Sequence, residues 1–115
     1  MTSLFTRVMR RRRARKVGLA PGSLVYTGEV ANGPPKIRVL DYGADTLREE
    51  ILTSVEACLP YRDSPTVSWI HVEGVHDEKL LEAFGHAFQI DPLAVEDILN
   101  TDQRPKLEDY GQSLF

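Results

Sequence analysis

The apolar residues of this chain come in short runs that charged and turn-forming residues interrupt. The longest uninterrupted stretches are only a few residues, such as Leu24-Val25-Tyr26. A membrane-spanning helix needs about 20 mostly apolar residues, so no segment here is expected to cross a bilayer. The basic N-terminus is not followed by the apolar core of a secretory signal. The pattern predicts short helices and strands around a modest core, in a chain that stays in the cytosol.

Charge divides the chain into two parts. Residues 7–16 hold seven of the 14 Lys and Arg and no acidic residue, whereas residues 17–115 hold the other seven against all 17 Asp and Glu. We expect residues 1–17 to form a disordered basic tail and residues 18–115 to form an acidic globular domain. Two interpretations of Arg10–Lys16 stay open, contact with anionic lipid or a solvated tail without a specific role. Nucleic acid is not expected as a partner, because no aromatic residues interleave with the arginines and the rest of the chain is acidic.

A hairpin and a helix are predicted in the first half. Leu24–Val30 is rich in β-forming residues, and Ile37–Leu40 alternates apolar and polar residues. Gly and Pro punctuate residues 31–35 between them. A helix is then predicted to begin at Asp45, a good N-cap, and to end at Pro60. Apolar residues recur at helical spacing along this segment, at Leu47, Ile51, Leu52, Val55 and Leu59.

The middle of the chain predicts a third strand and a second helix. Val67–Val72 is rich in β-forming residues, and its Trp69 is expected in the core. The helix is predicted to open at Asp77 or Glu78. Its apolar face, with spacings of three, four and seven residues, is made by Leu80, Leu81, Phe84 and Phe88.

A third, short helix is predicted over Leu93–Leu99, with Pro92 in its first turn and Asp91 as its cap. Residues 104–109 predict an ion-pair loop that turns the chain into a last strand, which begins at residues 113–115. The element order is therefore β-β-α-β-α-α-β. Alternating elements of this kind indicate a layered α/β domain.

Two segments resemble the CorA family of magnesium and cobalt transporters. Residues 18–28, Gly-Leu-Ala-Pro-Gly-Ser-Leu-Val-Tyr-Thr-Gly, are similar to the opening of many CorA cytosolic domains. Residues 90–100, running into Gln103–Lys106 and Glu108–Tyr110, resemble the family signature HPLxLEDILN…QRPKxExY. The sequence departs from that signature at Asp91, where His is common.

The resemblance covers about residues 18–115 and implies the N-terminal portion of a CorA-like cytosolic α/β domain, truncated before the stalk helix and the membrane helices. The family forms homopentameric channels for Mg²⁺ that often also pass Co²⁺. Transport is therefore implied for a longer parent protein at the inner membrane, with this part on the cytosolic face. The fragment alone cannot line a path through hydrocarbon. An alternative is a free-standing soluble module that binds divalent cations or modulates pentamers.

Glu96 and Asp97 are the candidate metal ligands. Adjacent helix residues point about 100° apart, so the two carboxylates cannot easily chelate one ion together. Mg²⁺ suits such a position, because it keeps several waters and takes one or two carboxylates. By resemblance, Asp97 matches the family's regulatory Mg²⁺ ligand, whose partner carboxylate comes from the stalk of a neighbouring subunit, and Glu96 matches a second, weaker site. On spacing alone the pair would be two solvated helix residues.

We expect structural roles for the cysteine and the histidines of the chain. Cys58 is the only cysteine, so no internal disulfide forms, and we expect a small buried side chain. His71, His76 and His86 lack the spacing of a metal site. No nucleophile lies beside a base, so the chain is not expected to be an enzyme.

Overall fold

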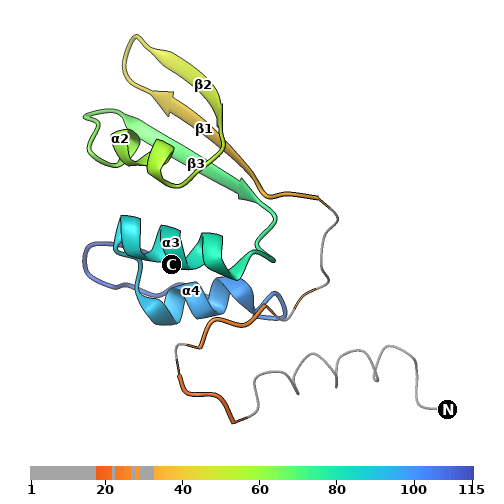
Figure 1. Ribbon diagram of the computed structural model, residues 1–115. Coiled ribbons are helices and arrows are strands. Elements are labelled where there is room, and N and C mark those ends of the chain that lie inside the picture. Colours follow the sequence, from red (N-terminus) through yellow and green to blue (C-terminus); the bar gives the residue numbers. More distant parts are fainter. Residues whose placement is uncertain (1–17, 22, 27, 29–32) are drawn as a thin grey trace, which may run out of the picture.

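A computed structural model describes residues 18–21, 23–26, 28 and 33–115. In order, the elements are β1 (Lys36–Tyr42), β2 (Leu47–Leu52), a 3-10 turn (Glu56–Cys58), α2 (Leu59–Arg62), β3 (Val67–Glu73), α3 (Glu78–Phe88) and α4 (Pro92–Leu99). The sheet, α3 and α4 follow one another as layers (Figure 1). The chain is thus the layered α/β domain that the sequence predicts. Within the described ranges, no helix is long and apolar enough to cross a membrane.

The segments before β1 depart from the prediction. Leu24, Val25 and Tyr26 are irregular rather than a strand, and residues 27, 29 and 30 lie outside the described residues. The basic tail of residues 1–17 also lies outside them, so its disorder and its contact with lipid stay predictions.

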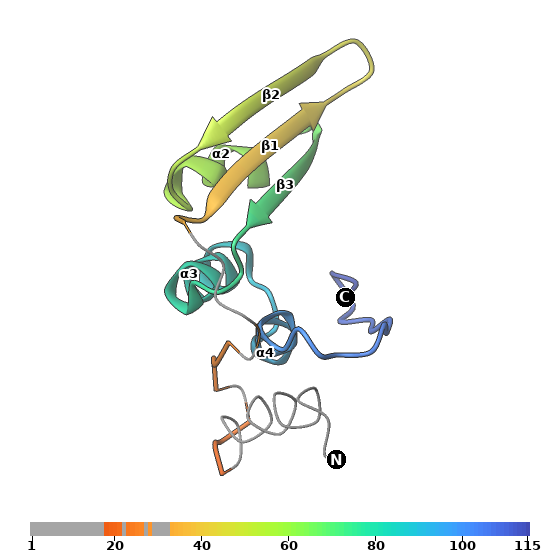
Figure 2. The same ribbon diagram turned by 90° about the vertical axis from the view of Figure 1, so that its right-hand side faces the viewer.

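β1 is the central strand of a three-stranded sheet with the order β2-β1-β3 (Figure 2). It pairs antiparallel with both neighbours, so that Ile37 lies opposite Leu52 in β2 and opposite Val72 in β3. The Gly43 amide donates to the carbonyl of Thr46 at 2.9 Å and closes the turn between β1 and β2. The hairpin therefore joins β1 to the segment after it, and the predicted pairing with the segment before it is wrong.

The helix predicted from Asp45 is wrong over its first half, because Leu47–Leu52 is strand β2. A spacing of four residues places Leu47 and Ile51 on one face of a helix, but equally on one face of a strand. The ladder with β1 selects the strand, and Asp45 lies in the preceding turn. Pro60 does not end a helix either. It sits in the first turn of α2, where its missing N–H costs nothing.

The main core lies between the inner face of the sheet and the helices α2 and α3. Its buried side chains come from β1, the turn after β2, and α3: Ile37, Val39, Val55, Cys58 and Phe84. Cys58 is fully buried, as predicted, and this burial raises the pKa of its thiol. Leu80 and Phe88 pack against the same cluster, so α3 is held against the sheet by the apolar face that the sequence predicts. Within that face, Phe84 stacks on Phe88 with 5.7 Å between ring centroids.

A second core lies between α3 and α4. It is formed by Leu81, Val95 and Leu99, with Leu24 and Tyr26 packed against it. A Cβ atom added at Gly85 would lie 3.0 Å from Val95 Cγ2, so this glycine permits the close approach of the two helices.

Both helices begin at the predicted caps. The carboxylate of Asp77 accepts from the Leu80 amide at 3.0 Å, and that of Asp91 accepts from the Leu93 amide at 2.8 Å. These bonds satisfy amides that the helices themselves leave unpaired. They fix where α3 and α4 start.

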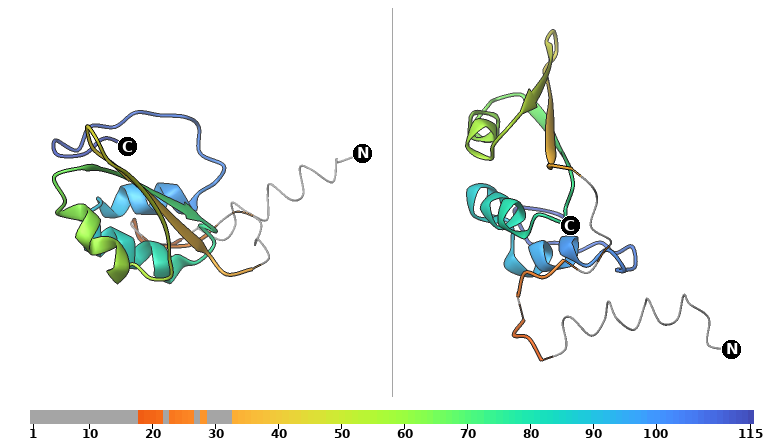
Figure 3. Two further views of the ribbon diagram at one scale, coloured as in Figure 1. Left: turned by 90° about the horizontal axis from the view of Figure 1, so that it is seen from above. Right: turned by 45° about the vertical axis from the view of Figure 1, so that its right-hand side comes forward.

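The outer face of the sheet is the largest departure from the expected core. Trp69 is 64% exposed, so its predicted burial is wrong. Strand residues alternate between faces, and in β3 Ile70 and Val72 pack on the core while Trp69 points the other way. Tyr42, Leu47, Ile51 and Val67 are exposed as well. No described element covers this face (Figure 3).

The second core predicts a matched pair of leucine variants. Leu99 is fully buried and Leu107 is 79% exposed. We expect Leu99→Ala to lower the free energy of unfolding by about 2–4 kcal/mol, because it leaves a cavity between α3 and α4. Leu107→Ala is expected to change it by less than about 0.5 kcal/mol. Urea unfolding of the two variants measures both values, and equal losses would contradict this packing.

The exposure of Trp69 is directly measurable, because it is the only tryptophan. We expect acrylamide to quench its fluorescence in the 115-residue chain nearly as efficiently as in a free tryptophan derivative. Trp69→Ser should leave stability almost unchanged, because an exposed indole contributes little burial. Strong protection from the quencher would show that the outer face is covered.

Candidate metal site

Asp97 lies in the last turn of α4, which Val95 and Leu99 anchor in the second core. Because Asp97 is two residues from each anchor, its side chain leaves the helix on the opposite face. The side chain is 18% exposed, so the carboxylate is partly withdrawn from water without being sealed off. The buried face of α4 therefore fixes the position of the carboxylate that the sequence singles out.

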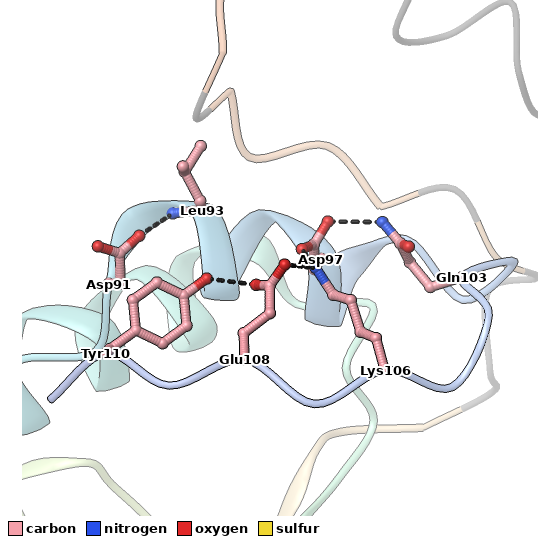
Figure 4. A network of polar contacts seen from close by, with 7 residues as sticks. All are labelled: Asp91, Leu93, Asp97, Gln103, Lys106, Glu108 and Tyr110. Atoms are coloured by element: carbon pink, nitrogen blue, oxygen red, sulfur yellow. Dashed lines mark hydrogen bonds and ion pairs between the residues drawn. The ribbon is translucent and has the colours of Figure 1, made fainter. Parts of the chain in front are cut away.

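Both carboxylate oxygens of Asp97 accept from the segment that follows α4 (Figure 4). Gln103 Nε2 donates to Oδ1 at 2.5 Å, and the ammonium of Lys106 donates to Oδ2. The chain after α4 thus folds back along the helix, and these two bonds hold it there.

Lys106 has further partners besides Asp97. Its Nζ lies 3.1 Å from Glu108 Oε1 and 5.3 Å from the ring centroid of Phe115. The hydroxyl of Tyr110 donates to Glu108 Oε2 at 2.7 Å. The ion-pair loop predicted for residues 104–109 is therefore confirmed for Lys106 and Glu108.

The last strand, predicted to begin at residues 113–115, is not part of the sheet. Instead these residues turn back on the segment before them, with Asp109 and Leu114 forming an isolated antiparallel bridge. The Glu108 and Phe115 amides donate to each other's carbonyls at 2.6 Å and 2.9 Å. This local pairing places the Phe115 ring against the Lys106 ammonium.

The network determines the charges around Asp97. The hydrogen bond that Lys106 donates to Asp97 raises the pKa of Lys106. Hydrogen bonds from Tyr110 and, to a lesser extent, from Lys106 lower the pKa of Glu108. The bond to Glu108 raises the pKa of Tyr110 to about 12, because ionising the phenol would lose a donor and set two anions together. At neutral pH, Lys106 is a cation, Glu108 an anion and Tyr110 neutral.

A surface pocket of about 510 Å³ opens beside this network. Its lining is Leu93, Glu96 and Asp97 of α4 together with Lys106, Glu108, Asp109 and Tyr110. The structure thus brings the two predicted ligands, Glu96 and Asp97, to one pocket. Two more carboxylates, from Glu108 and Asp109, share it.

The chemistry of these donors fits a hard cation. Mg²⁺ takes oxygen ligands and keeps several waters, so it can bind through one or two carboxylates. Across the part of the chain that the structure describes, no three acidic, histidine or cysteine side chains converge as metal ligands. The pocket can therefore supply part of a coordination sphere, which waters or another donor would complete.

The contacts of Asp97 with Gln103 and Lys106 are not predicted from the sequence. Both residues lie in the segment Gln103–Lys106 that the family signature includes, which is the one available signal. The signature shows that these positions belong together with Asp97. It does not show that the loop after α4 folds back to place them on the carboxylate.

Comparison with known proteins agrees with the resemblance. Residues 64–115 match the family model described as CorA-like Mg2+ transporter protein. The "Cobalt/magnesium transport protein CorA" of Thermotoga maritima is 43% identical over 105 residues, which are 91% of this chain and 30% of that protein. The chain thus spans about a third of the length of this curated relative. These matches, which include the segment that carries Glu96 and Asp97, support the assignment of the chain to the CorA family.

Proposed function

We propose that this chain is the Mg²⁺-sensing cytosolic part of a divalent-cation transporter that carries Mg²⁺ and Co²⁺, and that Asp97 is its regulatory ligand. The support is the relationship to a protein named for cobalt and magnesium transport, together with the position of Asp97. Its partly withdrawn carboxylate opens onto a pocket that three further acidic residues line.

The acidic charge of the domain favours this role. Residues 17–115 carry ten more acidic than basic residues, so they attract cations and repel similar surfaces. In a homopentamer, Asp97 would face a carboxylate on the stalk of a neighbouring subunit. A divalent cation supplies the positive charge that offsets the repulsion between two such groups.

Feedback on transport follows from this repulsion. When Asp97 and its counterpart share a cation, the subunits are held together and the closed pore is favoured. When the cation is scarce, the two carboxylates repel each other, the subunits move apart, and the conducting state gains population. Such a shift is set by the difference in cation affinity between the two states.

Asp97→Asn in the intact gene product tests the proposed ligand. The amide lacks the charge that attracts a cation, so we expect the Mg²⁺ concentration that half-inhibits uptake to rise about tenfold or more. Asp45→Asn is the control, because Asp45 is an exposed carboxylate in the turn before β2 and should leave inhibition unchanged. Uptake of Co²⁺ into cells or vesicles, at stepped Mg²⁺ concentrations, measures both. Equal inhibition of the wild type and Asp97→Asn would contradict the assignment.

Glu96→Gln separates the two neighbouring carboxylates. Because adjacent side chains leave a helix about 100° apart, Glu96 cannot easily share an ion with Asp97 and would hold at most a second, weaker one. We expect its removal to shift the half-inhibiting Mg²⁺ concentration by about threefold or less. A shift as large as that of Asp97→Asn would show that Glu96 is a principal ligand.

A further inference from the structure

We propose that Lys106 is a tethered counter-ion that competes with the divalent cation for Asp97, and so sets the cation concentration at which the site fills. This inference rests on the proposed function of Asp97 and adds a regulatory residue to it. It starts from the ammonium of Lys106, which occupies Oδ2 of the carboxylate (Figure 4).

Protein donors contact both carboxylate oxygens of Asp97, so a cation that binds there directly must share these oxygens with them or displace them. Gln103 is neutral, and the oxygen that it contacts has a second lone pair for a further partner. Lys106 is different, because its positive charge stands where the incoming charge would stand. Coulomb repulsion between them acts over a few ångströms in a partly dehydrated pocket. Binding at Asp97 therefore requires Lys106 to withdraw.

The structure provides a place for Lys106 to go. Glu108 Oε1 already lies 3.1 Å from its Nζ, and the Phe115 ring lies beneath it. Tyr110 donates to the other oxygen of Glu108 and holds that carboxylate in position. On leaving Asp97, the ammonium keeps an anionic partner and an aromatic one. The exchange thus moves one ion pair to another and leaves no charge unpaired.

The exposure of the pair suits a reversible exchange. The side chain of Lys106 is 30% exposed and that of Asp97 is 18% exposed, so water reaches both groups. A sealed ion pair would be costly to separate, and a fully solvated one would barely oppose the cation. Lys106 therefore raises the filling concentration without blocking the site.

Chemical footprinting of lysines in the intact gene product tests the exchange. The readout is the acetylation rate of Lys106 as Mg²⁺ is added, followed by mass spectrometry. We expect the rate to rise about threefold to tenfold, because the ammonium leaves its stronger pair. Lys36 on β1 is the internal control, since it is exposed and remote from the pocket, and its rate should stay constant. In Asp97→Asn, the acetylation rate of Lys106 should already be high without Mg²⁺ and should not change as Mg²⁺ is added.

Two variants of Lys106 test its effect on affinity. The readout is the protection of residues 96–110 from hydrogen exchange as Mg²⁺ is added, and its midpoint is the Mg²⁺ concentration that gives half of the full protection. Lys106→Gln removes the charge, so we expect its midpoint to lie about tenfold below that of the wild type. Lys106→Arg keeps the charge, and its midpoint should lie at or above that of the wild type. Unfolding curves of both variants check that the domain is intact.

The outcomes separate this inference from the proposed function. If Mg²⁺ protects the wild type but not Asp97→Asn, while the midpoint of Lys106→Gln and the reactivity of Lys106 do not change, the competition is overturned and the ligand stands. If Asp97→Asn responds to Mg²⁺ as the wild type does, the ligand assignment fails and the competition fails with it. Both proposals are supported if the midpoint falls in Lys106→Gln but not in Lys106→Arg, and if Mg²⁺ speeds the acetylation of Lys106 in the wild type.

Discussion

The rest of the structure depends on the packing of α3 between two apolar surfaces. Phe84 on one side contacts the inner face of the sheet, and Leu81 on the other contacts α4. Burying each side chain stabilises the domain by roughly 2 kcal/mol, and the two contacts together place α4 relative to the sheet. Because Val95 turns one face of α4 into this packing, Asp97 is left on the opposite face, where the pocket lies.

Where the sequence predicts correctly, local chemistry decides. Asp77 and Asp91 each precede a helix with the short acidic side chain that a cap needs, and both caps are present. Where it fails, tertiary pairing decides. Leu47 and Ile51 fit a helix and a strand equally well, and only the ladder with β1 selects the strand. Trp69 is a large apolar residue of the kind usually found in a core, but the register of β3 places it on the outer face of the sheet.

The candidate site divides in the same way. Its two candidate ligands are predicted from a continuous stretch of α4, because a family signature is local in the sequence. The counter-ion of Asp97 is nine residues away in an irregular segment. No periodicity describes such a loop, so the contact with Lys106 required the structure. Spacing alone predicts that Glu96 and Asp97 are two solvated residues. In the structure Asp97 is paired with Lys106, so a cation that binds Asp97 must exchange with that lysine.

A crystal structure of the intact gene product grown with Co²⁺, which gives an anomalous signal, tests most directly whether a cation binds Asp97 in place of Lys106. We expect a peak within coordination distance, about 2.1 Å, of an Asp97 carboxylate oxygen, with the Lys106 ammonium moved to Glu108. Anomalous peaks only elsewhere, with the Lys106–Asp97 pair intact in a crystal saturated with the ion, would contradict it.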